Sequence, residues 1–201
     1  PVRKALIGGP NIWCPIARDL HMPGSAERRA AGDRFWWYVC MQPKAPYATE
    51  FIDHPGTDLR VWLWQTWQHR VSGILIWETV YWSSPTIYGK ELQNPYKDAA
   101  SWSDMGTGPK TFRYNWGNGD GRFLYPPRSC FATDRNGPVV EAPNGTMRLE
   151  ILRDGIEDYE YFTILKRLAP SNPLLSIPKS VYRDLWTYTN DPEPMETHRE
   201  K

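Results

Sequence analysis

The sequence predicts an α/β fold in which strands and helices alternate around a parallel sheet. Three short apolar runs, at residues 11–15, 35–40 and 74–77, are separated by two segments with helical spacing. No hairpin turn signal lies between these runs, and strands that are joined through helices run parallel. With 201 residues, the chain is long enough for one domain with a core and hardly long enough for two.

The first predicted unit occupies the N-terminal part of the chain. Residues 2–7 are predicted as the end of a helix or a short strand, and residues 11–15 as a buried strand that Pro15 stops. Ser25 is a good N-cap for a short helix over residues 26–31.

The second unit starts with an aromatic run at residues 35–40. This run does not alternate with polar residues, so we expect a strand that is covered on both faces. Thr57 is placed to cap a helix over residues 58–71. The apolar positions of this helix fall four residues apart and predict one buried stripe, with Trp62 beside Leu59, Leu63, Trp67 and Val71.

The third strand, at residues 74–77, is followed by a long irregular stretch over residues 79–122. Structureless segments of this length are uncommon in compact domains and are usually functional where they occur. A short strand is predicted at residues 123–125, and a second loop follows it.

The strongest helical pattern covers residues 146–168. Its apolar positions predict one buried face, and its charged residues are expected to face water; the apolar positions are Leu149, Leu152, Ile156, Tyr159 and Phe162. A weaker helix is predicted over residues 180–188, and the polar tail over residues 190–201 is expected to be frayed or disordered.

Charge and composition argue against several classes of partner. The 24 basic and 23 acidic residues give a net charge of +1 and are mixed along the chain, whereas a nucleic-acid binder usually carries a clustered basic excess. No run approaches the roughly 20 apolar residues that span a bilayer. Neither the three cysteines nor the four histidines have metal-ligand spacing, so we expect no metal site. Cys14 and Cys40 are predicted to be buried free thiols.

Candidate ligand-binding residues follow from the strand ends, because the site of a parallel βα fold lies at the carboxyl ends of its strands. Trp77 is expected to form a floor under a sugar ring, and Glu78 to accept hydrogen bonds from its hydroxyl groups. The alternative is that Glu78 pairs with an arginine, Arg113 or Arg122, and fixes the loop.

Other aromatic and polar residues surround these strand ends. Adjacent residues of a strand point to opposite faces, so at most alternate members of Trp36, Trp37 and Tyr38 line the interior. Tyr81 and Trp82 follow the third strand. Residues 115–121 contain three glycines, which predicts a tight turn; the functional alternative, which is compatible with it, is a rim loop whose Asn118 or Asp120 contacts ligand.

No complete catalytic set is visible in the sequence. Glu157 and Asp158 are adjacent on the predicted helix and diverge by about 100°, so they are poor candidates for a glycosidase pair. The chain also has no nucleophile elbow, phosphate-binding loop or zinc-protease motif.

Several strings, in order, resemble the C-terminal catalytic-barrel region of glycoside hydrolase family 123, long labelled a domain of unknown function. The resemblance covers residues 11–168 and rests on NIWCP, ERRAAGDRFWWYVC, FIDHPGTDLRVWLWQ, GILIWETVYW, NPYKDAASW, WGNGDGRFLYPP and RLEILRDGIEDYEYF. It implies that residues 1–170 are the C-terminal portion of a (β/α)8 TIM-type barrel that is incomplete in this chain. A C-terminal helix and polar tail then occupy residues 171–201.

The resemblance also implies an activity. Characterised members are β-N-acetylgalactosaminidases, in which an Asp orients the 2-acetamido group of the sugar as the nucleophile and the adjacent Glu is the general acid/base. That Asp-Glu pair is expected upstream of Pro1, so the chain would supply only sugar-binding walls, need the N-terminal half of the barrel and use no cofactor. The wall residues are Trp36, Tyr38, Trp77, Glu78, Tyr81 and Trp82.

Two rival hypotheses remain at this stage. The chain could be a stand-alone carbohydrate-binding or scaffold protein derived from the barrel, or its parent could have lost the catalytic pair. No signal peptide is visible near the start, and the compartment stays open, with a secreted or periplasmic parent as one option.

Overall fold

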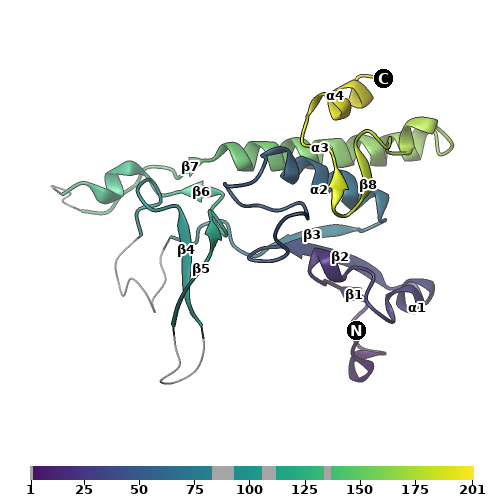
Figure 1. The fold of residues 1–201 in the computed structure, drawn as a ribbon, viewed down its shortest axis with the longest axis horizontal. Helices are drawn as coiled ribbons and strands as arrows, with labels where there is room; N and C mark the ends of the chain where they lie inside the picture. Colours follow the sequence, from purple (N-terminus) through teal and green to yellow (C-terminus); the bar gives the residue numbers. More distant parts are fainter. Residues whose placement is uncertain (1, 83–92, 106–111, 134–136) are drawn as a thin grey trace.

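The first part of the chain forms a three-stranded parallel sheet (Figure 1). The computed structural model describes residues 2–82, 93–105, 112–133 and 137–201. The strands β1 (Ile12–Trp13), β2 (Arg34–Val39) and β3 (Gly73–Ile76) are hydrogen-bonded in that order, and both pairs are parallel. The predicted parallel βα arrangement is therefore confirmed for the first three strands.

Helices connect these strands as predicted. The helix α1 (Ser25–Ala30) lies between β1 and β2, and α2 (Thr57–Gln68) lies between β2 and β3. Their N-caps are Gly24 and Gly56, so the predictions of Ser25 and Thr57 as caps are each wrong by one residue. Short 3-10 turns, η1 (Lys4–Leu6) and η2 (Ala17–Asp19), flank β1, so the helix end or strand predicted at residues 2–7 is one 3-10 turn.

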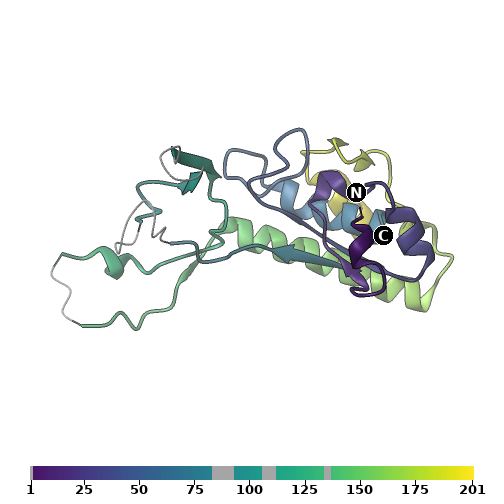
Figure 2. The same cartoon turned by 90° about the horizontal axis from the view of Figure 1, so that it is seen from below.

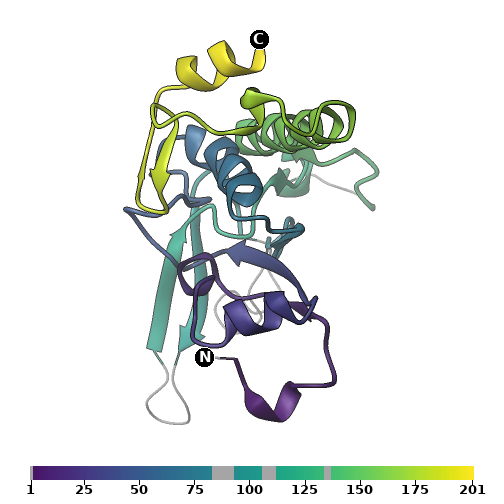
Figure 3. The ribbon, with the colours of Figure 1, turned by 90° about the vertical axis from the view of Figure 1, so that its right-hand side faces the viewer.

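The long helix α3 (Met147–Leu168) packs along α2, and the two form a layer on one side of the sheet (Figures 1 and 3). The side chain of Thr146 caps α3 by accepting a hydrogen bond from the Leu149 amide at 3.3 Å. Because α2 lies between the sheet and the C-terminal residues, it is buried from Asp58 to Thr66. The prediction of a single buried stripe on α2 is therefore wrong.

The buried face of α3 also differs from the predicted one. Ile156 is 42% exposed, whereas Arg148 and Asp158 are buried. Leu152, Gly155 and Phe162 complete the buried face, and a Cβ at Gly155 would lie 3.1 Å from the Cα of Arg60 on α2. The expectation that the charged residues of α3 face water fails because two of them form buried contacts with other segments.

Burial alternates along β2. Phe35, Trp37 and Val39 are buried toward the helices, while Trp36 and Tyr38 point to the other face. The indole nitrogen of Trp37 donates to Thr66 on α2 at 2.9 Å. The run was expected to be covered on both faces, but within the described residues only the helix side is covered.

The stretch after β3 contains more regular structure than predicted. An antiparallel hairpin joins β4 (Ala100–Met105) to β5 (Phe112–Asn118), where the sequence predicted an irregular loop. The strand β6 (Leu124–Tyr125), predicted at residues 123–125, pairs with β7 (Asn144–Gly145), and the turn η4 (Arg128–Phe131) lies between them. Residues 83–92 and 106–111 of the predicted loop lie outside the described residues. Figure 2 shows the described residues from β4 to β7 extending away from the three-stranded sheet.

The C-terminal residues are ordered into small elements. After the turn η5 (Pro173–Leu175), β8 (Tyr182–Asp184) and β9 (Thr187–Tyr188) form a hairpin where a helix was predicted. The tail was expected to be frayed, but it forms α4 (Glu193–Arg199), whose Met195 is fully buried. Val181, Tyr182 and Met195 pack with Val61, Trp64 and Phe162 in a second core cluster.

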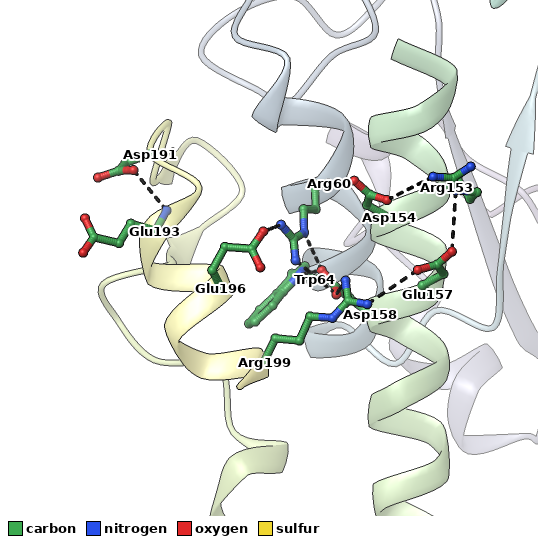
Figure 4. Close-up of polar contacts among 10 residues, drawn as sticks. All are labelled: Arg60, Trp64, Arg153, Asp154, Glu157, Asp158, Asp191, Glu193, Glu196 and Arg199. Carbon is green, nitrogen blue, oxygen red and sulfur yellow. Dashed lines mark hydrogen bonds and ion pairs between the residues drawn. The ribbon is translucent and has the colours of Figure 1, made fainter. Parts of the chain in front are cut away.

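A buried ion-pair network holds α4 against α2 and α3 (Figure 4). Arg60 on α2 donates to both carboxylate oxygens of Asp158 on α3, at 2.6 and 3.2 Å, and also to Glu196 on α4. Trp64 and Arg199 donate to the same Asp158 carboxylate, at 2.8 and 3.0 Å. Burial acts to lower the pKa of Arg60, but its hydrogen bonds to Asp158 and Glu196 leave that pKa above its ordinary value.

We expect Met195→Ala to lower the free energy of unfolding by about 2 kcal/mol, the low end for a core Met-to-Ala change, because a terminal helix can relax. Met147→Ala is the matched control. Met147 is 73% exposed, so its truncation should change stability by less than about 0.5 kcal/mol. Urea denaturation of both variants makes the comparison, and equal losses would mean that α4 does not contribute to the core.

The described strands form small sheets, and none of them closes into a barrel. None of the helices within the described residues is long and apolar enough to cross a membrane. The open face of the β1-β2-β3 sheet carries Trp36, Tyr38, Leu75 and the adjacent Trp77. The last three of these residues line the cavity that we take as the candidate site.

Candidate functional site

A cavity of about 400 Å³ lies at the carboxyl ends of β2 and β3, on the open face of the sheet. Tyr38 from β2 and Leu75 and Trp77 from β3 and its end form the sheet side. The full lining is Cys14, Tyr38, Cys40, Met41, Leu75, Trp77, Trp116 and Asp120. The strand ends predicted to form one pocket therefore do meet at one cavity.

Trp77 and Trp116 line this cavity, and Tyr81 packs against both of their rings. Trp77 lies with its ring centroid 5.1 Å from that of Tyr81 and 4.8 Å from that of Trp116, and Tyr81 and Trp116 are stacked at 5.5 Å. The Tyr81 hydroxyl donates to the backbone carbonyl of Trp102 at 2.8 Å, which ties this ring to β4. Trp77 remains 41% exposed, so part of its surface is open to a ligand.

Glycines bring Asp120 to the cavity. Gly119 and Gly121 have φ angles of +80° and +70°, which side chains rarely adopt. A Cβ at Gly121 would lie 2.8 Å from Cζ3 of Trp77, and a Cβ at Gly119 would lie 2.6 Å from the guanidinium of Arg148. The loop is therefore a tight turn, as the glycines predicted, and it also places Asp120 against the aromatic rings.

Asp120 shares its buried position with Glu50, which comes from the loop between β2 and α2. The exposed fractions are 0% for Asp120 and 1% for Glu50. No basic or hydroxyl side chain among the described residues donates a hydrogen bond to their four carboxyl oxygens. Burial, and then the hydrogen bond and charge of Asp120, raise the pKa of Glu50 well above its ordinary value, although Arg148 and the Gly121 amide oppose this shift.

Arg148 joins the segments that carry these two carboxyl groups. Its guanidinium donates to three backbone carbonyls, those of Glu50, Gly119 and Arg122. It thus fixes the start of α3 against both the Glu50 segment and the Asp120 loop. Burial lowers the pKa of Arg148, and the nearby Glu50 and Asp120 charges oppose this.

The remaining predicted residues lie around the cavity rather than in it. Glu78 accepts hydrogen bonds from the Thr79 and Val80 amides, each at 3.3 Å. Within the described residues, Glu78 forms no ion pair, which bears on the alternative that it pairs with an arginine. Arg122 donates to the Tyr81 carbonyl at 2.7 Å. The side chain of Arg113 lies outside what the structure describes.

Trp36, Trp82 and Asn118 make contacts away from the cavity lining. The Trp36 ring lies over Gly73, where a Cβ would be 2.6 Å from it. Trp82 donates to the Leu124 carbonyl at 2.7 Å, and Asn118 donates to Asp53 at 2.9 Å. Their roles as sugar contacts stay predictions.

The cysteines differ from the prediction. All three are free, but Cys14 is exposed and Cys40 is half-buried, so the two are not core thiols. Their lining of the cavity explains the exposure. Among the described residues, no group of three or more His, Cys, Asp or Glu side chains could hold a metal ion.

Larger cavities lie elsewhere, and one of about 650 Å³ separates α3 from α4. Three of the charged groups that line it, Asp158, Glu196 and Arg199, already pair with one another or with Arg60. It also lies away from the strand ends, so we take the smaller cavity beside Asp120 as the candidate site.

Three important residues of this site were not singled out from the sequence: Glu50, Trp116 and Arg148. Trp116 belongs to the glycine loop that was recognised, but no spacing rule marked its ring as part of the cavity. Glu50 and Arg148 lie in segments far from Asp120 in the chain, and only the fold brings them together.

A parallel βα sheet whose strand ends present aromatic rings and a buried carboxylate is an arrangement typical of enzymes that act on sugars. Residues 13–165 match the family model of the glycoside hydrolase 123 catalytic domain. The chain therefore belongs to glycoside hydrolase family 123, as its motifs indicated. No curated protein matches the chain significantly in sequence.

One similar solved structure is described as "The details of glycolipid glycan hydrolysis by the structural analysis of a family 123 glycoside hydrolase from Clostridium perfringens". The two chains are 19% identical with a TM-score of 0.53, and the match covers 87% of this chain. It covers only 26% of the other chain, so the present chain spans about a quarter of that protein's length.

Proposed function

We propose that the chain is the C-terminal part of a (β/α)8 barrel in a glycoside hydrolase, and that its cavity binds a terminal β-linked N-acetylhexosamine. The observation that carries the proposal is the cavity at the parallel strand ends, which Trp77, Trp116 and Asp120 line. Aromatic faces stack on the apolar faces of sugars, and carboxylates accept hydrogen bonds from sugar hydroxyl groups.

The open sheet face supports the barrel part of the proposal. Helices cover one side of the sheet, while Trp36, Leu75 and Trp77 on or beside the other side are 36%, 40% and 41% exposed. A barrel places such a face in its filled interior. Further strands of a longer chain would cover it, and they would carry the Asp-Glu pair that performs substrate-assisted hydrolysis.

The test compares the 201-residue chain with the longest natural chain that contains it. We expect the longer chain to release p-nitrophenol from p-nitrophenyl N-acetyl-β-D-galactosaminide, and the 201 residues alone to release none. Turnover by the 201 residues would refute the missing-pair proposal. Sugar affinity in a monomeric, cooperatively melting 201-residue chain, with an inactive longer chain, would favour the carbohydrate-binding or scaffold alternative.

Trp77→Ala should weaken sugar binding about tenfold in the longer chain, since an aromatic contact of this kind is worth about 1–1.5 kcal/mol. Trp186→Ala is the matched control, because Trp186 is 54% exposed and contacts Tyr47 away from the cavity. Titration calorimetry with N-acetylgalactosamine measures both. A similar loss in the two variants would argue against the cavity as the sugar site.

A further inference from the structure

We infer that Glu50 is a positioning residue: as a neutral acid it donates a hydrogen bond to Asp120 and holds that carboxylate, ionised, at the cavity beside Trp77. The inference rests on the proposed function only in naming the ligand that Asp120 meets. Glu50 itself does not line the cavity, so it acts through Asp120.

The first step is the geometry of the carboxyl pair. Both side chains are withdrawn from water, and their four oxygens find no basic or hydroxyl side-chain donor among the described residues. Two neighbouring carboxyl groups in such a place cannot both ionise at low cost. A proton shared between the two groups would join one oxygen of each in a hydrogen bond and would remove one of the two buried charges.

The second step is which residue holds the proton. The contact with Asp120 raises the pKa of Glu50, beyond what burial does, whereas the contact with Glu50 lowers the pKa of Asp120 against the effect of burial. Burial leaves the pKa of Asp120 above its ordinary value too, so the two groups share one proton. We assign that proton to Glu50, because Asp120 lines the cavity and faces more positive side chains than Glu50 does. An anion in the wall of the cavity attracts the hydroxyl or amide donors of a ligand more strongly than a neutral acid does.

The third step is the surroundings. The other charged or titratable groups that face the pair are Lys44 and Cys40 after β2, Arg122 beyond the loop and Arg148 on α3. Arg148 directs its N–H groups to three backbone carbonyls, and its charge favours one anion in the pair. Lys44 and Arg122 act on Asp120 and not on Glu50, so the surroundings favour the negative charge on Asp120.

The direction of the pH dependence follows. An unfolded Glu has a pKa of about 4.3, and the folded pKa of Glu50 lies above it. The stability that neutral Glu50 contributes is thus fully present below about pH 4.3 and is lost as the pH rises through the folded pKa. Sugar affinity should fall over the same range, because ionised Glu50 would repel Asp120.

The experiment uses the longest natural chain and the variants Glu50→Gln and Glu50→Ala. Glu50→Gln keeps a donor for Asp120 but cannot ionise, so it should retain most of the affinity for N-acetylgalactosamine and lose the alkaline fall. Glu50→Ala removes the donor and should bind about tenfold more weakly at every pH. Glu150→Gln, at a half-exposed site on α3, is the control and should keep the wild-type pH profile.

Infrared difference spectra of wild type minus Glu50→Gln provide a second readout that needs no sugar. At pH values between the ordinary pKa of Glu and the raised pKa of Glu50, they should contain the C=O stretch of a protonated carboxyl group. Its absence, or an unchanged alkaline fall in Glu50→Gln, would overturn the inference. If the wild type binds no sugar while the stretch and the pH-dependent urea midpoint are present, the proposed ligand fails and the role of Glu50 toward Asp120 stands.

Discussion

Replacing Asp158 by asparagine is expected to lower the free energy of unfolding by about 3–5 kcal/mol, one of the largest effects of a single substitution in this chain. The Asp158 carboxylate accepts hydrogen bonds from Arg60, Trp64 and Arg199 (Figure 4). The side chains of Arg60 and Asp158 are only 6% and 2% exposed. Without the negative charge, the Arg60 guanidinium would stay buried with Glu196 as its remaining charged partner.

Glu157→Gln is the matched control for this substitution. Glu157 is the neighbouring residue of α3, but its side chain is 47% exposed and its contacts with Arg153 and Arg199 are both 3.5 Å long. Exposed ion pairs of this kind contribute about 0–1 kcal/mol. Urea titrations of both variants measure the difference, and a loss below about 1 kcal/mol for Asp158→Asn would mean that the network does not hold α4.

Replacing Gly121 by alanine is expected to reduce kcat/KM on the order of tenfold to a hundredfold in the longest natural chain, because it displaces Asp120 and Trp77 together. The new Cβ would lie 2.8 Å from the Trp77 ring and 3.0 Å from the Cβ of Tyr81, an atom fixed to the backbone. The φ angle of +70° adds strain of about 1–2 kcal/mol.

Gly32→Ala separates crowding from backbone strain. Gly32 has a φ of +90°, and a Cβ there would meet nothing within 4 Å. This variant should lose a similar 1–2 kcal/mol of stability from its positive φ and keep its kcat/KM. Equal kinetic losses in the two variants would show that the crowding around Gly121 does not matter to the site.

The sequence predicted the elements whose patterns are local. The apolar runs that became β1, β2 and β3, and the long helix α3, all carry their signal within a few residues. The β4–β5 hairpin was missed because its strands are rich in Gly, Asn and Ser and depend on each other for pairing. The helix α4 was missed because Pro192 and a polar composition hide the one buried residue, Met195, that anchors it.

For the candidate site, too, the sequence predicted the residues whose signal is local. Tyr38 and Trp77 follow from the rule that parallel strands open their site at their carboxyl ends, and Asp120 was recognised within its glycine loop. Burial of a charged residue has no local pattern, so Arg148 and Asp158 were assigned to the solvated face of α3. Glu50 carries no motif at all, and its role depends on a residue distant in sequence.

The length of α3 has a mechanical consequence. At 22 residues the helix is about 33 Å long. Near one end, Arg148 donates a hydrogen bond to the Asp120 loop, and in the middle Asp158 accepts one from α4. A single helix therefore connects the Asp120 side of the cavity with the ion-pair network that holds α4. Hydrogen exchange should find these two regions opening as one cooperative unit, so a substitution that breaks the ion-pair network would also loosen the Asp120 loop.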